Sequence, residues 1–165
     1  MRRCVPVAVV VMFLVSAVAP AGEMTDSETA IDGVLKSLHQ AASEADGELY
    51  FSLFADGAIF LGTDATERWT VDELEAFAEP YFSTGRGWTY TATERHISVA
   101  ENGQTAWFDE VLRNETYGAC RGTGVLVLVD GDWKLAQYSL SIPMPNELAR
   151  EFTSAIRSFE GQEKR

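Results

Sequence analysis

The stretch that decides the fold runs from Trp88 to Ile142 and reads WTYTATERHISVAENGQTAWFDEVLRNETYGACRGTGVLVLVDGDWKLAQYSLSI. Apolar and polar residues alternate along it, and a period of two is typical of β-strands. Asn-Gly at 102–103 and Asp-Gly at 130–131 each separate two alternating segments, and such dipeptides are the strongest short-range signal for a β-hairpin. With a looser turn at 114–118, the stretch predicts four long antiparallel strands, at 88–101, 104–114, 119–129 and 132–142.

Before this stretch the apolar residues recur at helical spacing. Thr25-x-x-Glu28 and Thr70-x-x-Glu73 match the capping box that begins many helices, and they predict helices over 27–45 and 70–82. A short helix and a brief strand at 58–62 are expected between them. A Pro-x-Pro segment at 143–145 ends the meander, and helical spacing returns at 148–159. The sequence therefore predicts an α+β domain.

Residues 1–21 have the pattern of a secretory signal peptide. Arg2 and Arg3 precede an almost wholly apolar run, and Ala19-Pro20-Ala21 matches the small-x-small cleavage pattern. The apolar run is shorter than the roughly 20 residues that span a bilayer. We expect cleavage after Ala21 and export to the periplasm or the medium, which leaves a domain at 22–160 and a polar tail at 161–165, without membrane attachment.

Beyond residue 21 the chain is strongly acidic, because it keeps all 25 acidic residues and 11 of the 13 basic ones, for a net charge of −14. Such a surface repels nucleic acid and anionic membranes, so neither is an expected partner. Cys120 has no second cysteine in this part of the chain, and we interpret it as a buried small hydrophobe. His39 and His96 lie in separate elements without metal-ligand spacing, so no metal and no cofactor is expected.

The turn at 102–103 fixes which residues of the first hairpin face one another. In the register that a two-residue turn imposes, His96 lies opposite Asp109, with Trp107 on the same side of the sheet. Arg95 and Glu110 then share the other side. We expect the Glu110 carboxylate to pair with an arginine of the next strand, at position 121.

How the two hairpins join depends on the parity of the connection at 114–118. An even connection puts Asp109 and Trp107 on the same face as Gln137 and Ser139. An odd connection puts Asp109 with Tyr138 instead. We expect the even case.

Asp109 and His96 form the best candidate pair for acid–base chemistry. A carboxylate can hold an imidazole in one tautomer and raise its basicity, which suits a proton shuttle near neutral pH. Alternatively Asp109, desolvated beside Trp107, is itself the base. The competing interpretation is an ordinary cross-strand polar pair on a solvated face, which is common in sheets.

Four segments carry a family resemblance: FLGTDATERW at 60–69, AWFDE at 106–110, CRGTG at 120–124 and WKLAQY at 133–138. Together with helices that precede a long meander, they resemble the SnoaL-like branch of the nuclear-transport-factor-2-like superfamily over about residues 28–148. The resemblance implies a cone-shaped, curved antiparallel sheet, made of the four-strand meander and a short strand, wrapped on the N-terminal helices. It also implies a small-molecule pocket on the concave side and, as in many members, a homodimer through the sheet.

The same resemblance leaves the reaction open, because the superfamily includes isomerases, dehydratases, cyclases, epoxide hydrolases and members without known catalysis. Gln137 and Ser139 stand where histidines often occur in the family, which disfavours catalysis. We therefore rank a binding or accessory domain for a small, largely apolar molecule first. A cofactor-free lyase, isomerase or cyclase that uses Asp109 and His96 comes second, and a dimeric protein-interaction module third. The expected ligand contacts are Phe60, Trp69, Tyr90, Trp107, Gln137 and Ser139.

Overall fold

The computed structural model describes residues 24–163, so the expected signal peptide lies outside the described residues. The helices are α1 (Asp26–Glu44), α2 (Gly47–Ser52), α3 (Val71–Phe82) and α4 (Ala149–Glu163), with a 3-10 turn η1 (Asn146–Leu148) before α4. The strands are β1 (Phe54–Leu61), β2 (Arg68–Thr70), β3 (Thr91–Val99), β4 (Thr105–Asn114), β5 (Gly118–Val129) and β6 (Asp132–Ser141).

Both predicted capping boxes are present at the starts of α1 and α3. The Thr25 hydroxyl accepts from the backbone N–H of Glu28, while the Glu28 carboxylate accepts from the Thr25 backbone, and Thr70 and Glu73 repeat the arrangement. Each box satisfies backbone N–H groups that a helix end otherwise leaves without partners. The residues that the sequence selected as helix starts therefore do begin the helices that cover the sheet.

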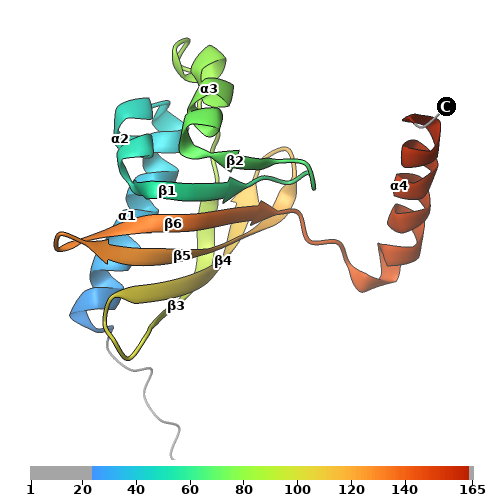
Figure 1. The fold of residues 1–165 in the computed structure, drawn as a ribbon. Helices are drawn as coiled ribbons and strands as arrows, with labels where there is room; N and C mark the ends of the chain where they lie inside the picture. Colours follow the sequence, from blue (N-terminus) through green and yellow to red (C-terminus); the bar gives the residue numbers. More distant parts are fainter. Residues whose placement is uncertain (1–23, 164–165) are drawn as a thin grey trace, which may run out of the picture.

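The strands form one curved sheet in the order β2-β1-β6-β5-β4-β3 (Figure 1). The predicted meander from β3 to β6 is antiparallel throughout, which confirms the α+β class. Strand β2 and the parallel pairing of β1 with β6 were not predicted. A three-residue strand is too short for a periodicity to show, and a parallel pair has no turn sequence to announce it.

The first hairpin has the predicted register, with His96 paired to Asp109. The expected even connection between the hairpins is wrong, because Asn114 pairs with Gly118 and three residues span the turn. Asp109 consequently pairs with Thr123 of β5.

A bulge in β6 then changes the faces a second time. Val125 pairs with Gln137 but the next residue of β5 pairs with Leu135, so Ala136 is an extra residue in β6. A β-bulge of this kind moves every later side chain to the opposite face. The two departures cancel, and Trp107, which pairs with Val125, does share a face with Gln137.

Helices α1, α2 and α3 pack on one face of the sheet, which we call the inner face, and the core lies between them. The opposite face, here the outer face, carries no helix of the described chain. Helix α4 does not cover it, because α4 packs on η1 and stands away from the domain (Figure 1). It also continues to Glu163, into the segment expected to be a polar tail.

Candidate functional site

A carboxylate that is almost wholly buried lies at the centre of the inner face. Glu110 is 1% exposed, and its two oxygens have separate partners. Oε1 lies 2.8 Å from Nε2 of His39 and accepts a hydrogen bond of 3.1 Å from the Tyr138 hydroxyl. Oε2 accepts from Nε and Nη2 of Arg95, at 2.8 and 2.6 Å. These four residues, Glu110, His39, Tyr138 and Arg95, are the buried polar cluster.

The cluster continues to the surface through Arg95. The guanidinium also donates from Nη1 to Asp32, and Asp32 forms an ion pair of 2.7 Å with Lys36 one helical turn further on. Burial alone would raise the pKa of Asp32, but the hydrogen bonds and charges of Lys36 and Arg95 outweigh it and lower the pKa below its ordinary value. A chain of alternating charges therefore runs from solvent to the core.

The same balance keeps Glu110 ionised. Burial would raise the pKa of Glu110, but the hydrogen bond and charge of His39 and the charge of Arg95 more than offset it, and the net shift is downward. For Tyr138, burial first and the Glu110 carboxylate second raise the pKa well above its ordinary value, so the phenol keeps its proton. The result is a buried anion held between a cation, an imidazole and a phenol.

A glycine on β5 and the spacing of polar residues on α1 allow this cluster to form. A Cβ at Gly122 would lie 2.7 Å from Oε1 of Glu110 and would press on the Tyr138 hydroxyl, so only glycine lets the two side chains meet there. On α1, Asp32, Lys36 and His39 are spaced by four and three residues, which puts them on one face of the helix.

The sequence analysis did not predict this cluster, although the register of the first hairpin already placed two of its members together. It placed Glu110 and Arg95 on one face of the first hairpin, which is correct, but it expected the carboxylate to pair with Arg121. That expectation is wrong, because Glu110 pairs with Arg95 on the inner face while Arg121 is exposed. The polar stripe of α1 would have supplied the remaining partner.

A cavity of about 270 Å³ opens beside the cluster, and we call it the aromatic cavity. The walls come from β1, β2, α3, the β4–β5 turn, β6 and the segment before β3. Trp69 stacks on Phe77 with ring centroids 4.7 Å apart, and Phe60 stacks on Tyr138 at 5.6 Å. The aromatic lining residues are Phe60, Trp69, Phe77, Trp88, Tyr90 and Tyr117.

A separate narrow space of about 20 Å³ lies on the inner side of the aromatic cavity, between it and the buried polar cluster. Phe60, Tyr90 and Leu140 line both spaces, and the narrow one adds His39 and Tyr138. Burial raises the pKa of Tyr90 to about 12, with smaller contributions from neighbouring groups, so its hydroxyl is a hydrogen-bond donor at neutral pH. The space is large enough for about one water molecule or one small polar substituent.

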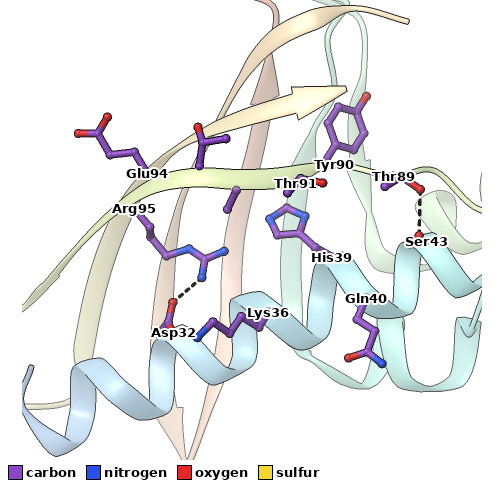
Figure 2. A pocket seen from close by; sticks show the side chains of 12 residues that line it. Asp32, Lys36, His39, Gln40, Ser43, Thr89, Tyr90, Thr91, Glu94 and Arg95 are labelled. Atoms are coloured by element: carbon purple, nitrogen blue, oxygen red, sulfur yellow. Dashed lines mark hydrogen bonds and ion pairs between the residues drawn. The ribbon is translucent and has the colours of Figure 1, made fainter. Parts of the chain in front are cut away.

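His39 also borders an open groove of about 480 Å³ between α1 and β3 (Figure 2). Figure 2 shows the imidazole pointing from α1 toward the segment that carries Thr89, Tyr90 and Thr91. Charged groups of both signs, hydroxyl groups and an amide line this groove, and the Ser43 and Thr89 hydroxyls lie 2.9 Å apart. His39 therefore lies between this groove and the narrow space.

The predicted site residues divide between the two faces of the sheet. Phe60, Trp69 and Tyr90 meet around the aromatic cavity. Trp107, Gln137 and Ser139 lie on the outer face, since they share cross-strand rows with Val125 and Thr123.

The predicted acid–base pair also lies on the outer face. Asp109 is exposed, and the His96 ring hydrogen-bonds to Glu94 at 2.9 Å with 64% of its side chain exposed. The cross-strand pairing of His96 and Asp109 is confirmed, while their role in catalysis stays a prediction.

Cys120 is buried, and burial raises the pKa of its thiol. Within residues 24–163 no three His, Cys, Asp or Glu side chains gather in a way that could hold a metal ion. None of the helices in that range is both long and apolar enough to cross a membrane.

This combination of fold and site corresponds to a known class of domain. The family model of the SnoaL-like domain matches residues 31–145, and the chain belongs to this family. No curated protein matches the chain.

Solved structures agree on the fold. A nuclear-transport-factor-2-like protein of unknown function from Pseudomonas putida superposes with a TM-score of 0.63 at 17% identity, covering 76% of this chain and 93% of that one. A domain of unknown function with a cystatin-like fold from Nostoc punctiforme gives 0.62 at 20% identity, covering 86% and 93%. A putative scytalone dehydratase from Novosphingobium aromaticivorans gives 0.61 at 19% identity, covering 73% and 89%.

Proposed function

We propose that this protein is an exported binding or accessory domain that holds a small, planar, largely apolar molecule in the aromatic cavity. The observation that carries the proposal is the convergence of aromatic rings from several separate elements on one cavity with a polar inner end. Ligand pockets combine apolar walls with a few placed polar groups in this way. At about 270 Å³ the cavity suits a molecule of one or two fused rings.

The polar inner end defines the second property of the ligand. Three residues with polar groups, His39, Tyr90 and Tyr138, line the narrow space there. A ligand that is flat and carries one hydroxyl or carbonyl group would stack against Trp69 and place its polar group toward His39. Export follows from the signal-peptide pattern of residues 1–21.

Binding of 2-naphthol, compared with its saturated analogue decahydro-2-naphthol, tests the proposal. The planar probe should quench tryptophan fluorescence saturably and bind at least ten-fold more tightly, because aromatic pairs gain energy beyond area burial. Trp69→Ala should weaken 2-naphthol binding by about ten-fold or more. Trp107→Ala, an exposed tryptophan on the outer face, is the matched control and should leave affinity unchanged. Equal weakening by both variants, or equal affinity for both probes, would exclude the aromatic cavity as the binding site.

A cofactor-free lyase, isomerase or cyclase is the second candidate, and one observation favours it. His39 is held by a buried ionised carboxylate next to the aromatic cavity, which is the arrangement of an oriented general base. The base would take a proton from carbon adjacent to a carbonyl group and return it to the same or another atom. On this proposal His39 replaces the exposed pair of His96 and Asp109.

Deuterium exchange distinguishes the two candidate bases. In D₂O, α-proton exchange of 2-tetralone should be accelerated by the wild-type protein and lost in His39→Ala, with His96→Ala as the control. If the accelerated exchange is lost in His96→Ala and kept in His39→Ala, the catalytic base is on the outer face. If the protein binds 2-naphthol but does not accelerate exchange, the result supports the binding function and excludes proton abstraction from this ketone.

A further inference from the structure

Exposed apolar side chains of the described chain form two groups whose members lie close together. One runs from the end of η1 along α4, where Leu148, Phe152, Ile156 and Phe159 are 42 to 62% exposed. Their spacing puts them on one face of the helix, while Arg150, Ser154 and Arg157 gather on the opposite side. A helix with an apolar stripe is stable in water only when another surface covers the stripe.

The other group lies at the mouth of the aromatic cavity. Phe77 and Tyr117 line the cavity yet are 46% and 56% exposed, and Tyr81 lies beside Phe77 at 41%. We call Phe77, Tyr81 and Tyr117 the mouth residues. An apolar patch of this kind marks a docking surface on a soluble protein.

The segment between β6 and η1 connects the wall of the aromatic cavity to α4 in sequence, but it holds α4 away from the cavity mouth of the same chain. Leu140 lines the aromatic cavity, and Ile142-Pro143-Met144-Pro145 follows after Ser141. A residue that precedes proline is restricted to extended conformations, and proline itself fixes φ, so this segment is stiff. It carries α4 outward from the end of β6 (Figure 1). A stiff connection of this length disfavours the reversal that would bring α4 onto its own mouth.

From these observations we infer that α4 of one copy lies across the cavity mouth of a second copy, and that the exchange is reciprocal. The phenylalanine and isoleucine side chains of the partner's α4 then close the aromatic cavity. Exchange of an identical element between two copies is a common route to dimers when the connecting segment is short. The dimer rests on the two exposed surfaces, and only its effect on ligand binding rests on the proposed function.

The areas support reciprocal exchange over simple pairing of two α4 helices. Four half-exposed apolar side chains cover roughly 300–400 Å² per helix, and a cavity mouth offers a similar area. Two exchanged contacts would therefore bury roughly 1,200–1,600 Å², the size of a stable interface. One contact between two α4 helices would bury about half as much.

Two variants of the full-length protein, studied alone and mixed, test the exchange by sedimentation equilibrium without any ligand. The helix variant carries Phe152→Asp and Phe159→Asp, and the mouth variant carries Phe77→Asp and Tyr117→Asp. All four side chains are exposed, so both variants should fold, which circular dichroism checks. Wild type should be dimeric at micromolar concentration, and each variant alone should dimerise at least 100-fold more weakly.

The mixture is the decisive measurement. The intact helix of the mouth variant meets the intact mouth of the helix variant, so the mixed dimer should form at least ten-fold more tightly than either variant with itself. A control with Ser154→Asp and Arg157→Asp, on the opposite side of α4, should stay dimeric.

Each other result overturns the exchange in a distinguishable way. A mouth variant that dimerises alone while the helix variant stays monomeric would show that α4 pairs with α4, and two variants that both dimerise alone would show a dimer through another surface, such as the sheet. A monomeric wild type would show that α4 has no second copy as partner. Because no ligand is present, these results stand apart from the outcome with Trp69→Ala and 2-naphthol.

Discussion

Two neighbouring carboxylates of β4 lie on opposite faces of the sheet and differ in burial. Asp109 and Glu110 are both carboxylates, and each lies near a histidine and a tryptophan or tyrosine. Glu110 is buried with every oxygen hydrogen-bonded, whereas Asp109 is exposed on the outer face. Water screens the charge of Asp109. Glu110 is shielded from water, so the loss of any of its partners would leave a buried charge uncompensated and would destabilise the fold. A carboxylate–histidine pair therefore acquires a functional or structural role from its surroundings and not from its spacing.

Removing each carboxylate in turn tests most directly whether the two differ in their contribution to stability. Glu110→Ala leaves Arg95 and His39 without their buried partner and should lower the free energy of unfolding by about 3–5 kcal/mol. Asp109→Ala, one residue earlier, should change it by no more than about 0.5 kcal/mol. Urea unfolding followed by circular dichroism measures both. Similar losses in the two variants would contradict the division between the faces.

The next effect concerns the space that Gly122 leaves. Gly122→Ala forces a methyl group toward Oε1 of Glu110 and the Tyr138 hydroxyl, and should cost about 1–3 kcal/mol of unfolding free energy. Thr123→Ala, the adjacent residue on the outer face, should cost about 0.5 kcal/mol or less. If Gly122→Ala is as stable as wild type, the glycine is not needed for the approach of Glu110 and Tyr138.

The ionisation of Glu110 gives a smaller, pH-dependent effect. Its folded-state pKa lies below the ordinary value of 4.5, so ionised Glu110 stabilises the fold above about pH 4.5, and this contribution is lost as the pH falls through the folded-state pKa. Asp32 acts in the same direction. The difference in unfolding free energy between wild type and Glu110→Gln should therefore shrink between pH 5 and pH 3. A constant difference over that range would mean that Glu110 does not titrate with a lowered pKa.

The smallest effect is expected for the exposed histidine of the outer face. His96 and Glu94 form an ion pair in which both side chains are more than 60% exposed, and such pairs contribute little because water and salt screen them. His96→Ala should change the unfolding free energy by less than about 0.5 kcal/mol. His39→Ala is the matched comparison and should be clearly less stable. A large loss for His96→Ala would give the outer face a structural role.

Much of the fold could be predicted because its signals are local. The two capping boxes and the two glycine turns act over three or four residues, and each begins or ends the element expected of it. The register of the first hairpin follows from its turn alone, which is why the pairing of His96 with Asp109 is correct. Of the expected ligand contacts, Phe60, Trp69 and Tyr90 do line the aromatic cavity, while their role in binding stays a prediction.

The candidate site could be predicted only in part because it depends on distant contacts. His39 and Glu110 are 71 residues apart, and no local pattern announces their hydrogen bond. The bulge at Ala136 shifts the faces of β6, and neither it nor the odd turn at 114–118 has a sequence signal strong enough to set the side of the sheet. A one-residue shift in a strand exchanges its two faces, and here two such shifts cancel, so the sequence grouped His96, Asp109 and Gln137 correctly but could not show which face the helices cover.

The sequence by itself determined the helices, the meander and the pairing within the first hairpin, since capping, turns and alternation depend on neighbouring residues. Only the tertiary structure decided which face of the meander α1 covers. That choice buried Glu110 with His39 and left Asp109 with His96 in water, because burial is a property of the assembled layers and not of any one strand. It also left α4 without a surface of its own chain to cover, which is why the further contacts of this domain are sought in a second copy.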